Sequence, residues 1–337
     1  MTSVTLSDVA QRAGVSESTV SRVLSQSRPV TPAIEATVRR AAAELGYSGN
    51  SIARALRRQR TDTVGMVVPS ILNPFFTALV DSIERALHDE GRVLFLCDSR
   101  QDPAIEAGYL RLLVDRKVDG IVVSPVDGEL SRAAIVETAT QVPLVQLDRR
   151  VNVENTDWVG VDDDDAMRQI VSHLADNGVR TAAFVTSDFT NSSTRDRLDG
   201  FRRHAADLGI ETRDDWMVFG DYSVESGHAA AVRLLSGTTR PEAIVCADDL
   251  IAFGVLQAAR ELGIPVPGSL QVTGFDNLVF AEHVIPPLTS IEQPTPQMAE
   301  EALRLMRTRM QKKDRLPGAR VALVPRLVVR GSTGVRP

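Results

Sequence analysis

Residues 5–25 read TLSDVAQRAGVSESTVSRVLS, a pattern that predicts two short helices joined by a tight turn. Four apolar residues recur at helical spacing in the first half: Leu6, Val9, Ala10 and Ala13. Gly14 can supply the positive φ that ends this helix, and Ser16 is a suitable N-cap for the next one. The apolar residues of the second helix then point inward and leave its polar side chains outside: these apolar residues are Val20, Val23 and Leu24.

A polar outer face on the second of two short helices is typical of a helix-turn-helix, whose second helix enters the DNA major groove. An ordinary helical hairpin is the alternative, but it requires neither this capping nor this polar face. We expect base contacts from three side chains on that face: Glu17, Ser18 and Arg22. A carboxylate can accept a hydrogen bond from cytosine, and a guanidinium can pair with guanine. Three other polar side chains are better suited to phosphates, which carry no sequence information: Arg12, Thr19 and Ser21.

The charge is distributed unevenly along the 337 residues. Residues 1–60 contain nine Arg, no Lys and four acidic residues, whereas the whole chain has a net charge of −6. The basic N-terminal part can therefore approach phosphates, and the acidic remainder cannot. Hydrophobic residues make up 43% of the chain, enough to build the cores of two or three compact units.

The cysteines and the apolar segments indicate the cellular compartment of the protein. Cys97 and Cys246 are the only cysteines, and each lies within an apolar run, so we expect two buried structural thiols in a reducing compartment. No signal-type apolar core is present, and no apolar stretch approaches the about 20 residues of a membrane-spanning helix. We therefore expect a cytoplasmic protein without a membrane partner.

Residues 31–46 predict a third helix, with Thr31 as N-cap, Pro32 at the first helical position and Gly46 as the stop. The three helices would form a helix-turn-helix domain over residues 1–47. Residues 48–61 are basic and too short to fold independently, so by themselves they are a linker.

From Thr63 onward, short β-branched runs alternate with amphipathic helical stretches, a pattern typical of buried parallel strands with crossover helices. It predicts two doubly wound lobes. Ligands of such sheets bind at the carboxyl ends of the strands. The polar residues that follow the strands are Asn73, Ser124, Asp148, Arg149, Asp248 and Asp276.

With Phe75 and Tyr222 beside them, these polar residues suit a polyhydroxylated ligand, because charged groups bind hydroxyls directionally and rings cover apolar sugar faces. Capping of the following helix is the alternative role for each strand-end Asp or Asn.

An enzyme is not indicated. The sequence has no phosphate-binding loop, no G-x-G-x-x-G, no G-x-S-x-G elbow and no H-E-x-x-H, and its five histidines are scattered. The acidic run Asp162–Asp165 fits the negatively charged start of a helix better than a metal site. We therefore predict no catalytic residues, no metal and no cofactor.

Residues 5–25 closely resemble the DNA-binding signature of the lactose repressor and galactose repressor (LacI/GalR) family, and the resemblance covers nearly the whole chain. It implies an all-α helix-turn-helix domain followed by a two-lobed periplasmic-binding-protein-like (type I) α/β effector domain over residues 62–337. In that fold the chain crosses between the lobes three times. We thus expect lobe 1 at about 62–160 plus 291–320, and lobe 2 at about 161–290 plus 321–331.

The same resemblance implies that the linker at 48–61 is a hinge helix that lies in the minor groove. The matching positions are Asn50, Ala53, Arg54 and Leu56, with Leu56 as the apolar wedge that kinks a central base step. Arg54, Arg57 and Arg58 would contact phosphates.

Two further motifs carry the resemblance into the effector domain. TRDRLDGF is similar to the family element S-x-x-R-x-x-G-F, which implies that Arg197 reaches the effector. CADDLIAFG is similar to an element usually written with Ala-Asn-Asp, so Asp248 occupies a position commonly held by asparagine. A carboxylate only accepts hydrogen bonds, whereas an amide also donates, so the bonding pattern at this position changes.

Together these features predict a DNA-binding transcriptional regulator, most simply a repressor, that binds a pseudo-palindromic operator as a homodimer. A small-molecule effector in the cleft, favoured to be a sugar or sugar derivative, would control DNA binding by shifting the lobes. No C-terminal heptad follows the last predicted strand, which favours a dimer over a tetramer. Two alternatives are a sugar-binding module without DNA regulation and a purine-type regulator that depends on a corepressor.

Overall fold

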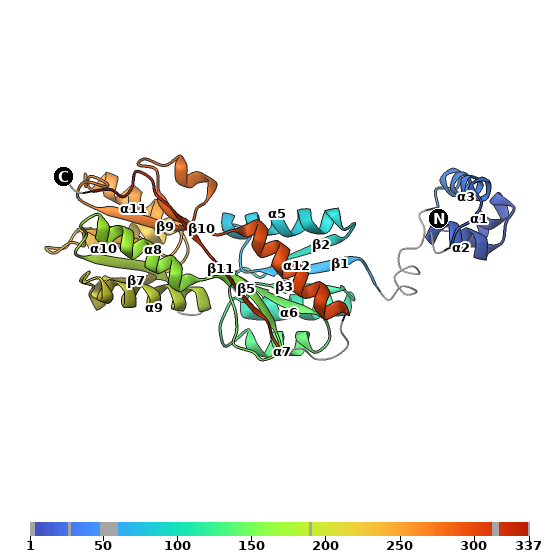
Figure 1. Cartoon of the computed structure of the whole chain (residues 1–337), viewed down its shortest axis with the longest axis horizontal. Coiled ribbons are helices and arrows are strands. Elements are labelled where there is room, and N and C mark those ends of the chain that lie inside the picture. The colour runs from blue at the N-terminus through green and yellow to red at the C-terminus, as the bar shows by residue number, and fades with distance from the viewer. Residues whose placement is uncertain (1–3, 26–27, 48–59, 189–190, 312–316, 336–337) are drawn as a thin grey trace. The chain divides into compact units, whose positions relative to one another are not determined.

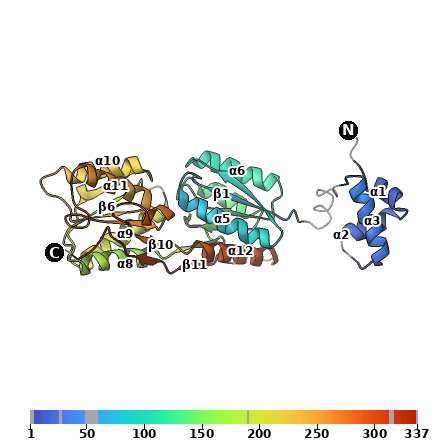
Figure 2. The ribbon, with the colours of Figure 1, turned by 90° about the horizontal axis from the view of Figure 1, so that it is seen from above.

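A computed structural model describes residues 4–25, 28–47, 60–188, 191–311 and 317–335. The chain divides into two compact units, Met1–Asp62 and Thr63–Pro337, which are seen from two directions in Figure 1 and Figure 2. The six residues expected to contact the minor groove and phosphates from the hinge lie outside the described residues: Asn50, Ala53, Arg54, Leu56, Arg57 and Arg58.

The N-terminal unit contains the three expected helices, α1 (Leu6–Ala13), α2 (Glu17–Ser25) and α3 (Pro32–Glu44). Thr5 and Asp8 form a capping box at the start of α1, and Gly14 ends it with φ 65°. Ser16 Oγ accepts the Thr19 N–H at 3.3 Å, as expected of the N-cap of α2. Thr31 lies at the start of α3 but makes no side-chain capping bond. The helices pack around a core that includes Val9, Val20 and Val38.

The first lobe of the second unit is a six-stranded sheet of order β11-β5-β4-β3-β1-β2, in which all neighbours are parallel. Its strands are β1 (Thr63–Val68), β2 (Val93–Asp98), β3 (Gly120–Val123), β4 (Leu144–Leu147), β5 (Asp157–Val161) and β11 (Arg320–Leu323). Its helices are α5 (Pro74–Asp89), α6 (Pro103–Asp115), α7 (Arg132–Ala139) and α12 (Thr295–Gln311). Figure 2 shows α5 and α12 together on one face of the sheet and α6 on the other.

The second lobe is a six-stranded sheet of order β12-β10-β9-β8-β6-β7, parallel except for the antiparallel pair β10 and β12. Its strands are β6 (Ala182–Ser187), β7 (Met217–Gly220), β8 (Ala243–Cys246), β9 (Gln271–Asp276), β10 (Thr289–Glu292) and β12 (Arg326–Val328). Its helices are α8 (Asp163–Asp176), α9 (Ser192–Asp207), α10 (Val224–Leu235) and α11 (Asp249–Glu261), with short 3-10 helices η1 (Asp214–Trp216) and η2 (Val279–Glu282). The predicted architecture of two lobes with parallel sheets is confirmed.

The chain passes between the lobes after β5, after β10 and after β11, as Figure 1 shows. Two of the expected boundaries are wrong by a few residues. Ile291 pairs with Phe275 of the second sheet, so residues 291 and 292 belong to the second lobe. Val321 pairs with Val159 of the first sheet, so residues 321–323 belong to the first. The chain crosses between the lobes only after a strand has finished pairing with its neighbour, so the lobe boundaries fall at the ends of these strands.

The strand β2 departs from the buried strand that its apolar residues predict. It lies at the end of the first sheet, and Val93, Phe95 and Leu96 are 57%, 45% and 44% exposed. Cys97 in this strand is only partly buried, so the expectation of two buried thiols holds for Cys246 alone. The cause is the position of β2 at an edge, which composition does not encode.

Across the described residues, no helix is both long and apolar enough to cross a membrane.

Helices α10 and α11 approach closely at glycines. A Cβ on Gly254 would lie 2.0 Å from the Val224 carbonyl oxygen, which belongs to backbone that cannot rotate away. We predict that Gly254→Ala lowers the free energy of unfolding of the second unit by about 1–3 kcal/mol. Tryptophan fluorescence in urea measures this unit alone, since Trp158 and Trp216 both lie in it.

Gly108→Ala is the matched control, because Gly108 lies inside α6 and a Cβ added there would meet no atom within 4 Å. Alanine there should raise stability by up to about 1 kcal/mol through its helix propensity. Equal effects of the two substitutions would contradict close packing between α10 and α11.

Candidate functional site

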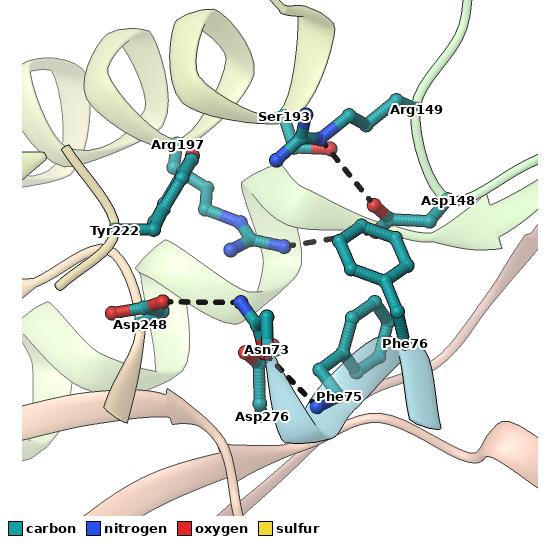
Figure 3. Close-up of a pocket in the computed structure, with 10 residues that line it drawn as sticks. All are labelled: Asn73, Phe75, Phe76, Asp148, Arg149, Ser193, Arg197, Tyr222, Asp248 and Asp276. Carbon is teal, nitrogen blue, oxygen red and sulfur yellow. Dashed lines mark hydrogen bonds and ion pairs between the residues drawn. The ribbon is translucent and has the colours of Figure 1, made fainter. Parts of the chain in front are cut away.

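The carboxyl ends of the strands of both lobes meet at a pocket with an empty volume of ≈ 260 Å³. Figure 3 shows the side chains that line it: Asn73, Phe75, Phe76, Asp148, Arg149, Ser193, Arg197, Tyr222, Asp248 and Asp276. Eight of the nine residues expected to face an effector are among them. The ninth, Ser124, is not among the lining residues, and its side chain is buried after β3 of the first lobe.

Phe76 and Ser193 line the pocket but do not follow from the sequence patterns. Phe76 is adjacent to Phe75, and both aromatic residues of that pair reach the pocket. Ser193 lies one helical turn before Arg197 on α9, so helical spacing from the arginine was the available signal.

Asn73 and Asp248 each have two roles. Asn73 caps α5 by accepting the Phe75 N–H at 2.9 Å, and Asp248 caps α11 by accepting the Ile251 N–H at 2.8 Å. The remaining polar atoms of both side chains face each other across the cleft, where Asn73 Nδ2 donates to Asp248 Oδ2 at 3.5 Å. Capping and a position in the pocket are therefore not alternatives here, because one side chain does both.

Arg197 is held rigidly at the floor of the pocket. Its Nε donates to Asp163 Oδ1 at 2.8 Å and its Nη1 to the Ala247 carbonyl at 2.7 Å, while its guanidinium lies 3.5 Å from the Phe275 ring centroid. Burial alone would lower the pKa of Arg197, but the carboxylates of Asp163 and Asp276 raise it. Its Nη2 lies 4.0 Å from Asp148 Oδ1 and faces the pocket.

Arg149 lies between two aromatic rings, 5.4 Å from the centroid of Phe76 in the first lobe and 5.4 Å from that of Tyr222 in the second. Its Nε is 4.0 Å from Asp148 Oδ2, too far for a hydrogen bond. Asp148 and Asp276 have φ values of 63° and 99°, which are strained for residues with a side chain.

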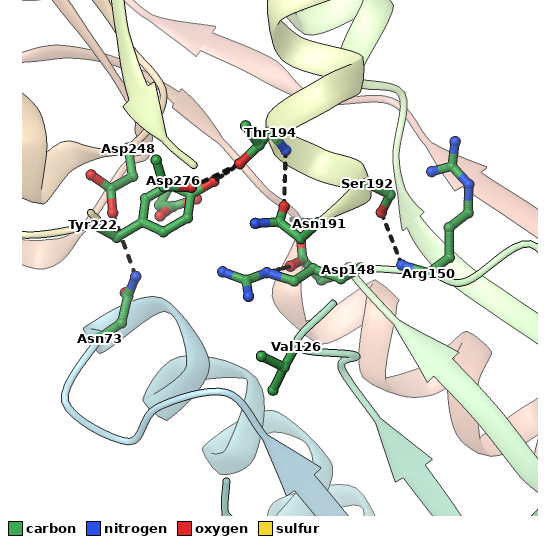
Figure 4. A network of polar contacts seen from close by, with 12 residues as sticks. Asn73, Val126, Asp148, Arg150, Asn191, Ser192, Thr194, Tyr222, Asp248 and Asp276 are labelled. Carbon is green, nitrogen blue, oxygen red and sulfur yellow. Dashed lines mark hydrogen bonds and ion pairs between the residues drawn. The ribbon is translucent and has the colours of Figure 1, made fainter. Parts of the chain in front are cut away.

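A second set of polar contacts joins the lobes beside the pocket, as Figure 4 shows. The Arg150 N–H donates to Ser192 Oγ at 2.9 Å, and its guanidinium pairs with Asp196 at 2.7 Å. Tyr222 is oriented by a 2.6 Å hydrogen bond between its hydroxyl and Thr194 Oγ1. The Arg150 contacts thus join the two lobes beside the pocket.

Burial raises the pKa of several carboxyl groups around the pocket. Desolvation raises the pKa of Asp163 to about 6 and that of Asp248 to about 6, although Arg197 lowers both. Asp249 lies behind Asp248, accepts hydrogen bonds from Ser290 Oγ and the Leu278 N–H, and has a pKa raised to about 8, first by desolvation. The pocket is thus a site where ionised carboxylates lack sufficient solvation.

A wider chamber of ≈ 750 Å³ adjoins the pocket and shares four of its lining residues: Asn73, Phe76, Arg149 and Tyr222.

The Asp162–Asp165 run begins α8, where Asp162 Oδ1 accepts the Asp165 N–H at 3.0 Å, as expected of a helix start. The described residues contain no group of three or more His, Cys, Asp or Glu that could hold a metal ion.

In the N-terminal unit, α2 presents the three expected base-reading side chains, Glu17, Ser18 and Arg22, to the exterior. Thr19 and Ser21 are partly buried. Arg12 is exposed and pairs with Glu44 at 2.5 Å.

Similarity to known proteins decides the family. Residues 5–50 match the model for bacterial regulatory proteins of the lacI family, and residues 171–333 match a periplasmic-binding-protein-like domain. The HTH-type transcriptional repressor PurR of Mannheimia succiniciproducens is 31% identical over 328 residues, 97% of this chain and 98% of that protein. The chain belongs to the lacI family of bacterial regulatory proteins.

Other relatives agree with this lacI-family membership. PurR of Photobacterium profundum is 31% identical over 97% of this chain and 98% of that protein. The lac repressor dimer bound to operator and the anti-inducer ONPF superposes with a TM-score of 0.89 at 26% identity, covering 99% of this chain and 100% of that one. The regulator CelR in complex with cellobiose has a TM-score of 0.74 at 31% identity, over 98% and 99% of the two chains.

The predicted family and the predicted DNA-binding regulator are confirmed by these matches. The relatives are transcriptional repressors and not enzymes, which agrees with the prediction of a non-enzymatic protein.

The raised pKa of Asp249 predicts how stability depends on pH. Because the folded pKa is about 8 and the ordinary value is 3.8, the folded state is favoured while Asp249 is protonated, and this contribution is lost as the pH rises to about 8. We predict that the free energy of unfolding falls between pH 4 and 8 and that Asp249→Asn reduces the fall. Urea unfolding across this range is the measurement.

Asp207→Asn, at an exposed end of α9, is the control and should leave the pH profile unchanged. The same slope in Asp249→Asn as in the unmodified chain would rule out Asp249 as its source.

Proposed function

We propose that this chain is a repressor that binds a pseudo-palindromic operator as a homodimer and changes its affinity for DNA when a sugar or sugar derivative occupies the cleft. The supporting observation is that both lobes contribute charged side chains to one pocket and are joined beside it by polar contacts. A ligand bound to both walls has different affinities for different lobe arrangements, which is the requirement for control. A regulator of this kind acts in the cytoplasm, where bacterial DNA lies.

A hydroxylated ligand is favoured by the open bonding capacity of the pocket. Asp148 lies 4.0 Å from the guanidinium groups of both Arg149 and Arg197, so its carboxylate and these two donors are near each other but not hydrogen-bonded. A sugar hydroxyl both donates and accepts, and can therefore bridge a carboxylate and a guanidinium. The CelR complex with cellobiose shows that a relative with this fold takes a sugar.

The purine-type alternative is supported by the PurR relatives. A flat base would need an aromatic face to stack upon. The ring faces of Phe76 and Tyr222 that meet across the cleft are already occupied by the Arg149 guanidinium. A base that stacks on these two rings would therefore have to displace the Arg149 guanidinium.

Pairing of two copies is supported by the exposed apolar edge of the first sheet. Val93 and Phe95 lie on one face of β2 and are 57% and 45% exposed, which is unusual for an edge strand in contact with water. The related lac repressor is a dimer on its operator. Two helix-turn-helix units would then read two half-sites.

A gel shift tests the repressor and its ligand class together. The full chain is mixed with the DNA upstream of its own gene, with and without a panel of sugars and nucleobases. We predict a shift that at least one sugar alters and that no nucleobase alters. Control by a nucleobase alone would support the purine-type alternative. The absence of any shift, together with sugar binding that survives deletion of residues 1–60, would support a sugar-binding module without DNA regulation.

Base readout by α2 is tested by selection from a random DNA library followed by sequencing. Arg22→Ala should relax the preference at one position of each half-site, a loss of about 1–3 kcal/mol of discrimination. Arg12→Ala should weaken binding to all sequences alike and reduce the salt dependence. Equal weakening on every sequence by Arg22→Ala would exclude a role in base readout.

A further inference from the structure

The inner pocket has more carboxyl groups than guanidinium groups. Three carboxyl groups line it, Asp148, Asp248 and Asp276, together with the two guanidinium groups of Arg149 and Arg197. Arg197 also donates to a fourth, Asp163, directly behind the pocket wall. Its positive charge is therefore shared between Asp163 and the pocket carboxyl groups.

Asp248 and Asp276 are the two lining carboxyl groups that form no ion pair with either guanidinium group in the described part of the chain. Both side chains lie on the second-lobe side of the pocket, near Asn73 of the first lobe, in the views of Figure 3 and Figure 4. Their hydrogen bonds come from neutral groups: the Ile251 N–H and the Asn73 amide for Asp248, and Gln293 Nε2 at 2.7 Å for Asp276. Asp276 Oδ2 has no hydrogen-bond partner among the described residues.

No cation is hydrogen-bonded to this pair within the described chain. Desolvation raises the pKa of Asp248 to about 6 and that of Asp276 well above its ordinary value, although Arg197 acts on both groups through space. Two carboxylates in a desolvated site without a bonded cation are costly, and a ligand that supplies the cation removes that cost.

We propose that the effector is an amino sugar whose protonated amine binds between Asp248 and Asp276. This rests on the sugar-binding role proposed above and specifies its ligand class. An ammonium group donates up to three hydrogen bonds and balances the charge of the lining. A neutral hydroxyl in the same place leaves the imbalance, and a sugar acid increases it.

The proposed contact makes binding depend on pH. In the empty pocket the pKa of Asp248 is raised to about 6, first by desolvation, and an adjacent ammonium group favours its ionised form. Affinity for the amine should therefore rise from pH 5 to 7, and binding should release protons across this whole range, because burial also raises the pKa of Asp276 well above its ordinary value. The titratable and charged groups that face Asp248 are Arg149, Arg197, Cys246, Asp249 and Asp276.

Calorimetric titration of the full chain with matched hexoses tests the charge of the ligand. Glucosamine, glucose and glucuronate carry charges of +1, 0 and −1 on one ring, and the corresponding galactose and mannose series vary the hydroxyl stereochemistry. We expect the amino sugar of one series to bind at least roughly tenfold more tightly than its parent hexose, and the acid to bind most weakly.

Asp248→Asn isolates the proposed contact. Asparagine keeps the shape and can still cap α11, so the variant should fold, and the ratio of the affinities for the amino sugar and its parent hexose should fall to within about threefold. Asp199→Asn is the control, since it removes one negative charge at an exposed position of α9 in the same lobe and should leave the preference intact.

Equal or tighter binding of the hexose or of the acid, or an undiminished preference in Asp248→Asn, would overturn the amine while leaving the sugar-binding role standing. If no member of any series binds, the sugar-binding role fails and the amine fails with it.

Discussion

The burial of opposite charges between two lobes is the constraint on which the effector unit depends. Carboxylates and guanidinium groups taken out of water are costly unless they are bonded. Here Asp148 lies 4.0 Å from both Arg149 and Arg197, close enough for attraction and too far for hydrogen bonds. The pocket is therefore held in an incompletely bonded state, and a ligand that inserts polar groups into these gaps gains what the protein alone does not.

Local structure places these groups with little freedom. Asn73 and Asp248 are fixed because each caps a helix, and Arg197 is fixed because Asp163 and the Ala247 carbonyl hold two of its nitrogens. The side chains that cap these helices thus also point into the pocket from both lobes. The pocket therefore lies where polar side chains of the two lobes contact each other.

Much of this site could be predicted from the sequence, because parallel strands bring their carboxyl ends to one edge. Asn73, Asp248 and Asp276 follow from that rule alone. Ser124 obeys the same rule and is nevertheless enclosed in the first lobe, since the rule does not say which strand ends face the partner lobe. The edge position of β2 and the exact lobe boundaries near residues 291 and 321 could not be predicted from the sequence, because both depend on which strands pair across long sequence separations.

Without a ligand, the carboxyl groups of the cleft are buried and incompletely bonded. Infrared spectroscopy of the full chain, which distinguishes protonated from ionised carboxyl groups, tests it directly. A protonated carboxyl band that titrates near pH 6 and weakens in Asp248→Asn is the predicted result. A chain in which every carboxyl group is ionised above pH 5, in the absence of any ligand, would contradict it.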